Sequence, residues 1–234
     1  MSYSQVFHSI YFVIVAAGFL LSAGIKMITS GMNHKILKKV ETIDWNGYDA
    51  LMQMLSFYGI QDVAVEKQEG MFGDRFVPGT KTIQMGEVSY SSPSLIGIAA
   101  ALHQGCHAVQ NDRMHIVIIF KYLLGFACRF AALLAAAAMP VMLFFPRALY
   151  AGLAAYSYII ILSIGLAVTE LEGIRYASGF VRSSGRLDTA QIAEVKRILS
   201  VQSVSGIAAV FTPADMMINI LTDGIKNLKR RLWK

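Results

Sequence analysis

The sequence predicts a mostly α-helical membrane protein with three transmembrane helices and a small cytoplasmic α+β layer. Hydrophobic residues make up 55% of the 234 residues and charged residues only 15%, a balance unlike that of an ordinary soluble protein. Apolar runs of about 20 residues, the length that spans a bilayer, occur near the N-terminus and again in the second half of the chain. Between them lies one water-compatible segment with turns that contain glycine and proline.

The charged residues give a net charge of +6 and indicate a membrane surface as the partner. The basic residues do not interleave with aromatic side chains along one face, so we expect no nucleic-acid partner. They are better explained as markers of the cytoplasmic side of the membrane, where lysine and arginine are enriched. With only two cysteines, Cys106 and Cys128, no disulfide framework is expected.

Residues 1–30 are expected to hold the first transmembrane helix, because residues 6–25 are apolar and carry no charge. We do not interpret this run as a signal peptide, since no lysine or arginine precedes it. Lysines follow it, which predicts that the N-terminus lies outside and the next segment in the cytoplasm. Residues 116–146 and 147–169 are expected to form the second and third helices, which returns residues 170–234 to the cytoplasm.

The cytoplasmic layer is expected over residues 31–115. Helical spacing of apolar residues predicts a helix over 48–58, and alternation predicts short strands over 62–66 and 81–85. A further helix, with Pro93 in its first turn, carries the motif described below. A layer of this size is too small to bury a large core alone, so we expect it to lean on the membrane helices.

The tail is expected to contain two elements after the third span. Amphipathic spacing predicts a helix over residues 189–201. Residues 205–225 are moderately apolar, but Pro213 and Asp215 make them a poor transmembrane span. A span there would also export the basic C-terminus, so we expect an amphipathic or re-entrant element on the cytoplasmic side.

Two histidines four residues apart, His103 and His107, lie in an apolar stretch that predicts a helix. On a helix, this spacing places both imidazoles on one face, where they can bind one zinc ion, as in the H-E-x-x-H signature of metalloproteases. Gln104 stands where that signature has its glutamate. The glutamate is the general base that takes a proton from the attacking water, and an amide cannot do so.

Glu170 is the candidate third ligand, because the expected topology returns both it and His103 to the cytoplasmic membrane surface. A catalytic zinc site commonly has two histidines, one carboxylate and an open position. On the residues alone, an ordinary interfacial charge explains Glu170 equally well, and both interpretations stay open. Cys106 lies within the motif and could contact metal, but a small buried thiol is the simpler interpretation.

The chain also resembles a known family, the YugP-type membrane zinc metallopeptidases, which are distant relatives of the gluzincins. The resemblance extends over about residues 47–209. Its motifs are similar to G-x-L-x-D-x-Y-x-P at residues 70–78, to S-x-x-A-x-x-V-A-A-H-E-x-G-H-A-x-Q at 94–110, and to E-F-D-A-S-x-x-A at 170–177. The chain departs from them at Gln104, at Cys106, where the family has glycine, and at residues 172–174.

This resemblance implies a gluzincin-like layer with zinc as the cofactor and His103, His107 and Glu170 as its ligands. It implies a membrane-embedded metalloendopeptidase that cleaves a peptide or a membrane-proximal protein at the cytoplasmic face, with position 104 as the catalytic base. The substrate would lie extended along a strand, for which residues 82–85 are the candidate, by strand addition. Membrane lipid is the other expected partner, and the oligomeric state stays open.

Gln104 then has two explanations. It is expected to be an introduced exchange of glutamate for glutamine that leaves the chain inactive, because the other site residues, His103, His107 and Glu170, are all present. The alternative is a natural pseudoprotease that binds peptides or partners. A different class of function, a membrane binding or scaffold protein without metal or enzymatic activity, also remains open.

Overall fold

The computed structural model describes residues 43–68, 74–141, 144–145 and 148–208, together with the isolated positions 13, 20, 24, 27 and 28. The expected first transmembrane helix and most of the element expected at 205–225 lie outside these residues. Contacts divide the chain into two compact units. One comprises Met1–Lys26, Leu124–Ile164 and Gly206–Lys234, and the other comprises Met27–Leu123 and Gly165–Ser205.

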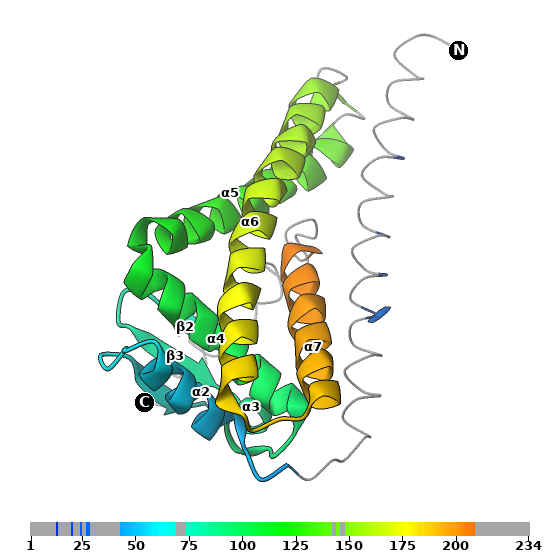
Figure 1. Ribbon diagram of the computed structural model, residues 1–234. Helices are drawn as coiled ribbons and strands as arrows, with labels where there is room; N and C mark the ends of the chain where they lie inside the picture. Colours follow the sequence, from blue (N-terminus) through cyan, green and yellow to red (C-terminus); the bar gives the residue numbers. More distant parts are fainter. Residues whose placement is uncertain are drawn as a thin grey trace, which may run out of the picture. The chain divides into compact units, whose positions relative to one another are not determined.

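A three-stranded sheet forms one layer of the second unit (Figure 1). Its strands are β1 (Ala64–Lys67), β2 (Arg75–Val77) and β3 (Thr82–Met85), in the order β1-β3-β2. β3 pairs parallel with β1 and antiparallel with β2, so it is the central strand. The expectation that substrate adds to residues 82–85 is therefore wrong, because both edges of that strand are already hydrogen-bonded.

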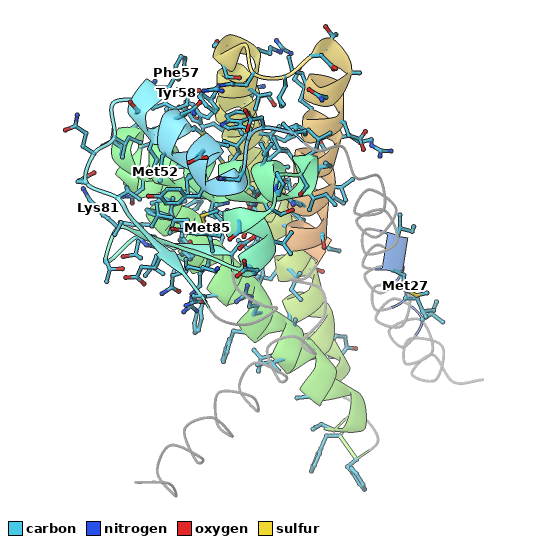
Figure 2. The ribbon with its side chains drawn as sticks, turned by 90° about the horizontal axis from the view of Figure 1, so that it is seen from below. Met27, Met52, Phe57, Tyr58, Lys81 and Met85 are labelled. Carbon is cyan, nitrogen blue, oxygen red and sulfur yellow. The ribbon has the colours of Figure 1, made fainter. Side chains whose placement is uncertain are left out.

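Helix α2 (Gly47–Phe57) confirms the helix expected at 48–58. Its N-cap is Asn46, whose side chain accepts a hydrogen bond from the main-chain N–H of Asp49 at 2.8 Å. The helix ends before Gly59, which has a φ of +78°, a conformation that glycine adopts without steric cost. Figure 2 shows Phe57 and Tyr58 at this end of α2, where the Tyr58 hydroxyl donates to the carbonyl of Tyr176 at 2.8 Å.

Helices α3 (Glu87–Ser91) and α4 (Leu95–Arg113) follow the sheet. Ser94 caps α4, because its hydroxyl accepts from the main-chain N–H of Gly97 at 3.2 Å. Pro93 therefore precedes the cap and is not in the first turn, which corrects the sequence expectation. Serine is favoured at this N-cap because its hydroxyl can accept a hydrogen bond from a main-chain N–H group of the first turn that has no partner within the helix.

Three long helices complete the described chain: α5 (His115–Val141), α6 (Ala148–Ser184) and α7 (Thr189–Ala208). Among the described residues, two segments are long and apolar enough to cross a membrane, Ile116–Leu134 and Tyr150–Ser184. They overlap the second and third expected spans, 116–146 and 147–169, but the second segment continues past residue 169 to Ser184 because α6 is one helix over that length. In the second unit, α7 lies beside the C-terminal half of α6 (Figure 1), so the helix expected at 189–201 is confirmed and continues to Ala208.

The hydrophobic core of the second unit is built from both halves of the sequence. It lies between α2, the sheet, α4 and the adjoining parts of α6 and α7. Its largest fully buried side chains are Leu51, Met54, Leu55, Phe76, Ile83, Met85, Ile98, Leu102, Ile118 and Ile198. The small layer is expected from the sequence to lean on the membrane helices. It shares one core with α6, which contains a candidate span, and also with α7, whose described residues contain none.

Two glycines allow neighbouring helices to approach α4 closely. A Cβ atom at Gly105 would lie 2.7 Å from Cδ1 of Leu51, which belongs to α2. A Cβ atom at Gly173 of α6 would lie 2.7 Å from the sulfur of Cys106. Both separations are shorter than a carbon atom tolerates, so glycine at these positions sets how near α2 and α6 pack against α4.

Candidate metal centre

The two motif histidines lie one turn apart on the face of α4 that is turned toward α6. Their ring centroids are 4.9 Å apart and their planes are nearly perpendicular, at 80°. The pairing follows from the sequence spacing alone, since residues four apart on a helix share a face. The side chain of His107 is buried, and that of His103 is only slightly exposed.

Glu170 of α6 meets both histidines, although it is more than sixty residues away in the chain. Its two carboxylate oxygens lie 3.6 Å from Nε2 of His103 and 3.9 Å from Nε2 of His107. Zinc bonds of about 2.0–2.1 Å at tetrahedral angles place donor atoms about 3.3–3.5 Å apart. The three side chains expected from the sequence are therefore brought together at nearly the spacing that a zinc ion requires, and two imidazoles with a carboxylate suit zinc chemically.

Helix α7 supports Glu170 from the other side. The hydroxyl of Ser203 donates a hydrogen bond of 3.2 Å to Oε2 of Glu170. The carboxylate is 8% exposed by residue, so this donor matters: a buried charge is costly unless its oxygens have partners. Nothing in the sequence pattern pointed to Ser203, because its role depends on how α7 packs against α6.

Lys121 of α5 is a further member of the cluster that sequence reasoning did not assign to it. Its Nζ lies 2.6 Å from Oε1 of Glu170 and 2.7 Å from Nε2 of His107. The signal that could have found it is a charge inside an apolar run that is long enough to span a membrane. Such residues are expensive in a membrane helix and usually face a polar interior.

Gln110 orients His107 from one turn further along α4. Its amide oxygen lies 3.0 Å from Nδ1 of His107, and its amide nitrogen donates to the carbonyl of Thr169 at 2.7 Å. This network assigns the proton of His107 to Nδ1 and leaves Nε2 with the free lone pair. A partner of this kind, bonded to the far nitrogen of a ligating histidine, is usual around protein metal sites.

Burial keeps both imidazoles neutral. It lowers the pKa of His103, and it lowers the pKa of His107 to about 3 with the added effect of the nearby Lys121 charge. Neutral imidazole is the form that binds metal. Nδ1 of His103 is buried and, within the part of the chain that the structure describes, has no hydrogen-bond partner.

Cys106 lies near the histidines, but its sulfur is used elsewhere. Cys106, His103 and His107 have donor atoms within 4.8 Å of one another, which makes them a possible metal group by distance. The thiol, however, donates to the carbonyl of His103 at 2.9 Å and lies 3.7 Å from Nδ1 of His107, the nitrogen already bonded to Gln110. Burial raises the pKa of the Cys106 thiol, which disfavours the thiolate that metals bind.

Gln104 faces the edge strand β2. Its amide oxygen accepts a hydrogen bond of 3.1 Å from the main-chain N–H of Phe76. The hydroxyl of Tyr122 donates to the carbonyl of the same residue at 2.5 Å. Both main-chain polar groups of Phe76 are thus bonded to side chains on the side of β2 that does not pair with β3.

A cleft of about 260 Å³ opens beside His103 and Gln104. One wall comes from α4 and the other from α7. Its lining residues are Asp74, Ala100, His103, Gln104, Val201, Gln202 and Ser205. The amide oxygen of Gln202 is buried and has no hydrogen-bond partner among the described residues.

Comparison with known proteins agrees with the motifs. The sequence profile of a family described as "Putative neutral zinc metallopeptidase" matches residues 11–222. The chain is 23% identical over 205 residues to a protein of Bacillus subtilis (strain 168) named "Putative membrane protease YugP", and the match covers 86% of this chain and 89% of that protein. No solved structure matches the chain. The resemblance drawn from the motifs is confirmed, and the chain belongs to the family of neutral zinc metallopeptidases that the profile describes.

Proposed function

We propose that this chain is a membrane-embedded zinc metalloendopeptidase scaffold that binds a peptide substrate and, with glutamine at position 104, does not cleave it efficiently. His103, His107 and Glu170 would hold the zinc ion. The observation that carries the proposal is the approach of the Glu170 carboxylate to within 3.6 and 3.9 Å of the two imidazole Nε2 atoms. Two imidazoles and one carboxylate are the donor set that a catalytic zinc ion commonly takes.

The chemistry follows from what each side chain can do. Zinc, when bound, would supply a Lewis acid that polarises the scissile carbonyl. A carboxylate at position 104 would take the proton of the attacking water, but the amide of Gln104 has no basic site for it. General-base loss typically lowers a rate by about 10²–10⁴-fold, which is why we propose binding without efficient turnover.

The cleft between α4 and α7 is the proposed substrate site. His103 and Gln104 line it, so a peptide held there would have its scissile bond beside the metal ligands. The buried amide oxygen of Gln202 could accept a main-chain N–H of that peptide, which would give this oxygen the partner it lacks among the described residues. β3 is excluded as the strand for a main-chain pairing, and β2 is the edge strand that borders Gln104.

We further propose that the site lies at the cytoplasmic face, with the N-terminus outside and three spans in all. The lysines at 35, 38 and 39 and the basic C-terminus support this orientation through the positive-inside rule. The substrate would then be a peptide or a membrane-proximal segment of another protein. Labelling of single cysteines placed near Gly79 and Lys234 in oriented vesicles tests this topology, and labelling from opposite sides would refute it.

The proposed zinc site is tested by zinc content. Purified protein in detergent should hold about one zinc per chain, and His103→Ala and Glu170→Ala should each abolish it. Glu194→Gln, the same change at an α7 carboxylate that pairs with the exposed Arg197, is the matched control and should keep the metal. Zinc retained undiminished in both site variants would refute the ligand assignment.

The two explanations of Gln104 are separated by restoring the carboxylate. If Gln104→Glu binds zinc and cleaves peptides, the chain is a peptidase disabled at one position. If that variant binds zinc but cleaves nothing, the pseudoprotease is the better description. A protein that binds no zinc in any variant would leave the membrane scaffold as the remaining function.

A further inference from the structure

The ammonium group of Lys121 lies where the metal ligands converge. Its Nζ is 2.6 Å from Oε1 of Glu170 and 2.7 Å from Nε2 of His107. These are the same two atoms that the zinc site proposed above would use. The lysine side chain is only 15% exposed, so this is an internal contact and not a passing surface ion pair.

We propose that Lys121 is a tethered cation that lies beside the metal position of this site and supplies its positive charge in the metal-free protein, so that zinc binds only in exchange for the ammonium group. The proposal rests on the zinc site proposed above and adds a residue that controls its occupancy. Lys121 would lower the affinity of the site for zinc, because its ammonium group competes with the ion for Glu170 and His107.

The geometry makes the two cations mutually exclusive. A zinc ion would lie about 2.0–2.1 Å from each of the atoms that Nζ now contacts. The short contacts of Nζ to both atoms place it beside that point, at a separation where two positive charges repel strongly in a buried site. Nζ also lies 3.3 Å from Nδ1 of His107, so it lies over the imidazole ring, beside the Nε2 lone pair on which a metal would bind.

Charge balance explains why the metal-free site is stable with lysine in it. Neutral imidazoles at positions 103 and 107 leave the Glu170 carboxylate as the negative charge of the cluster. A buried carboxylate without a partner is strongly destabilising, and Lys121 supplies that partner from α5. Ser203 Oγ bonds only the other carboxylate oxygen, so it does not replace the lysine.

The lysine side chain can also leave. Four methylene groups separate its ammonium group from the helix, and such stems commonly swing to place the charge in water. Exchange then has two consequences that can be measured. Zinc must offset the loss of the lysine contacts, which weakens zinc affinity. The Lys121 amine must become accessible to reagents when zinc is bound.

The first experiment compares zinc affinity and thermal stability of the purified full-length protein and Lys121→Met, a neutral side chain of similar length. Zinc affinity is measured by competition with a chromophoric chelator. We expect Lys121→Met to bind zinc at least about tenfold more tightly. Without zinc, its apparent Tm should fall by about 5–15 °C, and zinc should restore it. Lys67→Met is the matched control, since Lys67 pairs with Glu87 on the surface, and should change neither value.

The second measurement needs no substitution. Wild-type protein is treated with an amine-reactive acetylating reagent with and without zinc, and the modified peptides are quantified by mass spectrometry. Lys121 should be protected without zinc and modified with it, while the exposed Lys81 should react equally in both states and serve as the internal reference.

The outcomes separate this inference from the proposed zinc site. Equal zinc affinity in wild type and Lys121→Met, with zinc lost in Glu170→Ala, would overturn the exchange and leave the zinc site standing. Protection of Lys121 in the zinc-loaded protein would do the same. If neither wild type nor Lys121→Met binds zinc, both the exchange and the proposed zinc site are wrong.

Discussion

Gln104 on α4 accepts a hydrogen bond of 3.1 Å from the main-chain N–H of Phe76 on β2. The residue at the general-base position therefore also ties the motif helix to the edge of the sheet. A chain with glutamine at position 104 can therefore still fold. Like a carboxylate, the amide has an oxygen that accepts the hydrogen bond from Phe76, but unlike a carboxylate it cannot take up a proton.

We predict that Gln104→Glu creates peptidase activity without disturbing the fold. A carboxylate can still accept from Phe76, and it can also act as a base, so the rate should rise by about 10²–10⁴-fold over wild type. The assay is incubation with a peptide library, read by mass spectrometry, with phenanthroline as the metal-removing control. Gln104→Ala should stay inactive and should lose about 1–3 kcal/mol of stability, because the buried N–H of Phe76 would lack its acceptor.

We predict that Gln110→Leu weakens zinc binding although Gln110 does not touch the ion. Without its amide, Nδ1 of His107 loses the partner that fixes the ring and its tautomer. Loss of such a partner typically costs about 10–100-fold in metal affinity. Chelator competition measures the change, and Gln61→Leu, on the exposed loop after α2, is the control. Unchanged affinity in Gln110→Leu would show that packing alone orients His107.

We predict that Gly173→Ala destabilises the protein and weakens zinc binding together. The added Cβ would lie 2.7 Å from the sulfur of Cys106 and would push α6, which carries Glu170, away from α4. Such overpacking typically costs about 1–3 kcal/mol, measurable by denaturant unfolding in detergent. Cys106→Ala should relieve the clash, so the double variant should recover. Gly206→Ala, where a Cβ meets nothing within 4 Å, should be neutral or slightly stabilising.

We predict that the metal-free protein loses stability as the pH falls below about 6.5, the ordinary pKa of histidine. Burial lowers the pKa of His103, and it lowers the pKa of His107 to about 3, so the unfolded chain takes up protons that the folded chain refuses. Stability is therefore fully present above pH 6.5 and is lost as the pH falls, and for His107 the loss continues toward pH 3 at up to about 1.4 kcal/mol per pH unit. Unfolding measured across this pH range in wild type and His107→Gln tests it; the variant should show the weaker dependence.

We predict that Gln202→Leu weakens peptide binding without changing zinc affinity. Gln202 lines the cleft, and its buried oxygen is the acceptor proposed for a main-chain N–H of the substrate. One such hydrogen bond is worth about 0.5–1.5 kcal/mol, or up to about tenfold in affinity. Titration of a fluorescent peptide that Gln104→Glu cleaves measures the change. Equal peptide affinity would place the substrate away from α7.

The sequence by itself determined what depends on neighbours in the chain. The imidazoles of His103 and His107 share a face because four residues make about one helical turn, whatever surrounds the helix. The glutamine at position 104, where the family motif has glutamate, is likewise visible from one residue type at one position. The two candidate membrane helices follow from the length of their apolar runs, and α2 follows from the spacing of Leu51, Met54 and Leu55.

Tertiary structure decided what depends on packing between distant segments. Glu170 reaches the histidines because α6 can approach α4 closely at Gly173, a contact that no local pattern encodes. β3 became the central strand because pairing order is a property of the whole sheet, so the expected site of strand addition was wrong. Lys121 contacts Glu170 and His107 for the same reason: a charge in an apolar run must find a polar partner, and only the packing of α5 against α4 and α6 determines which one.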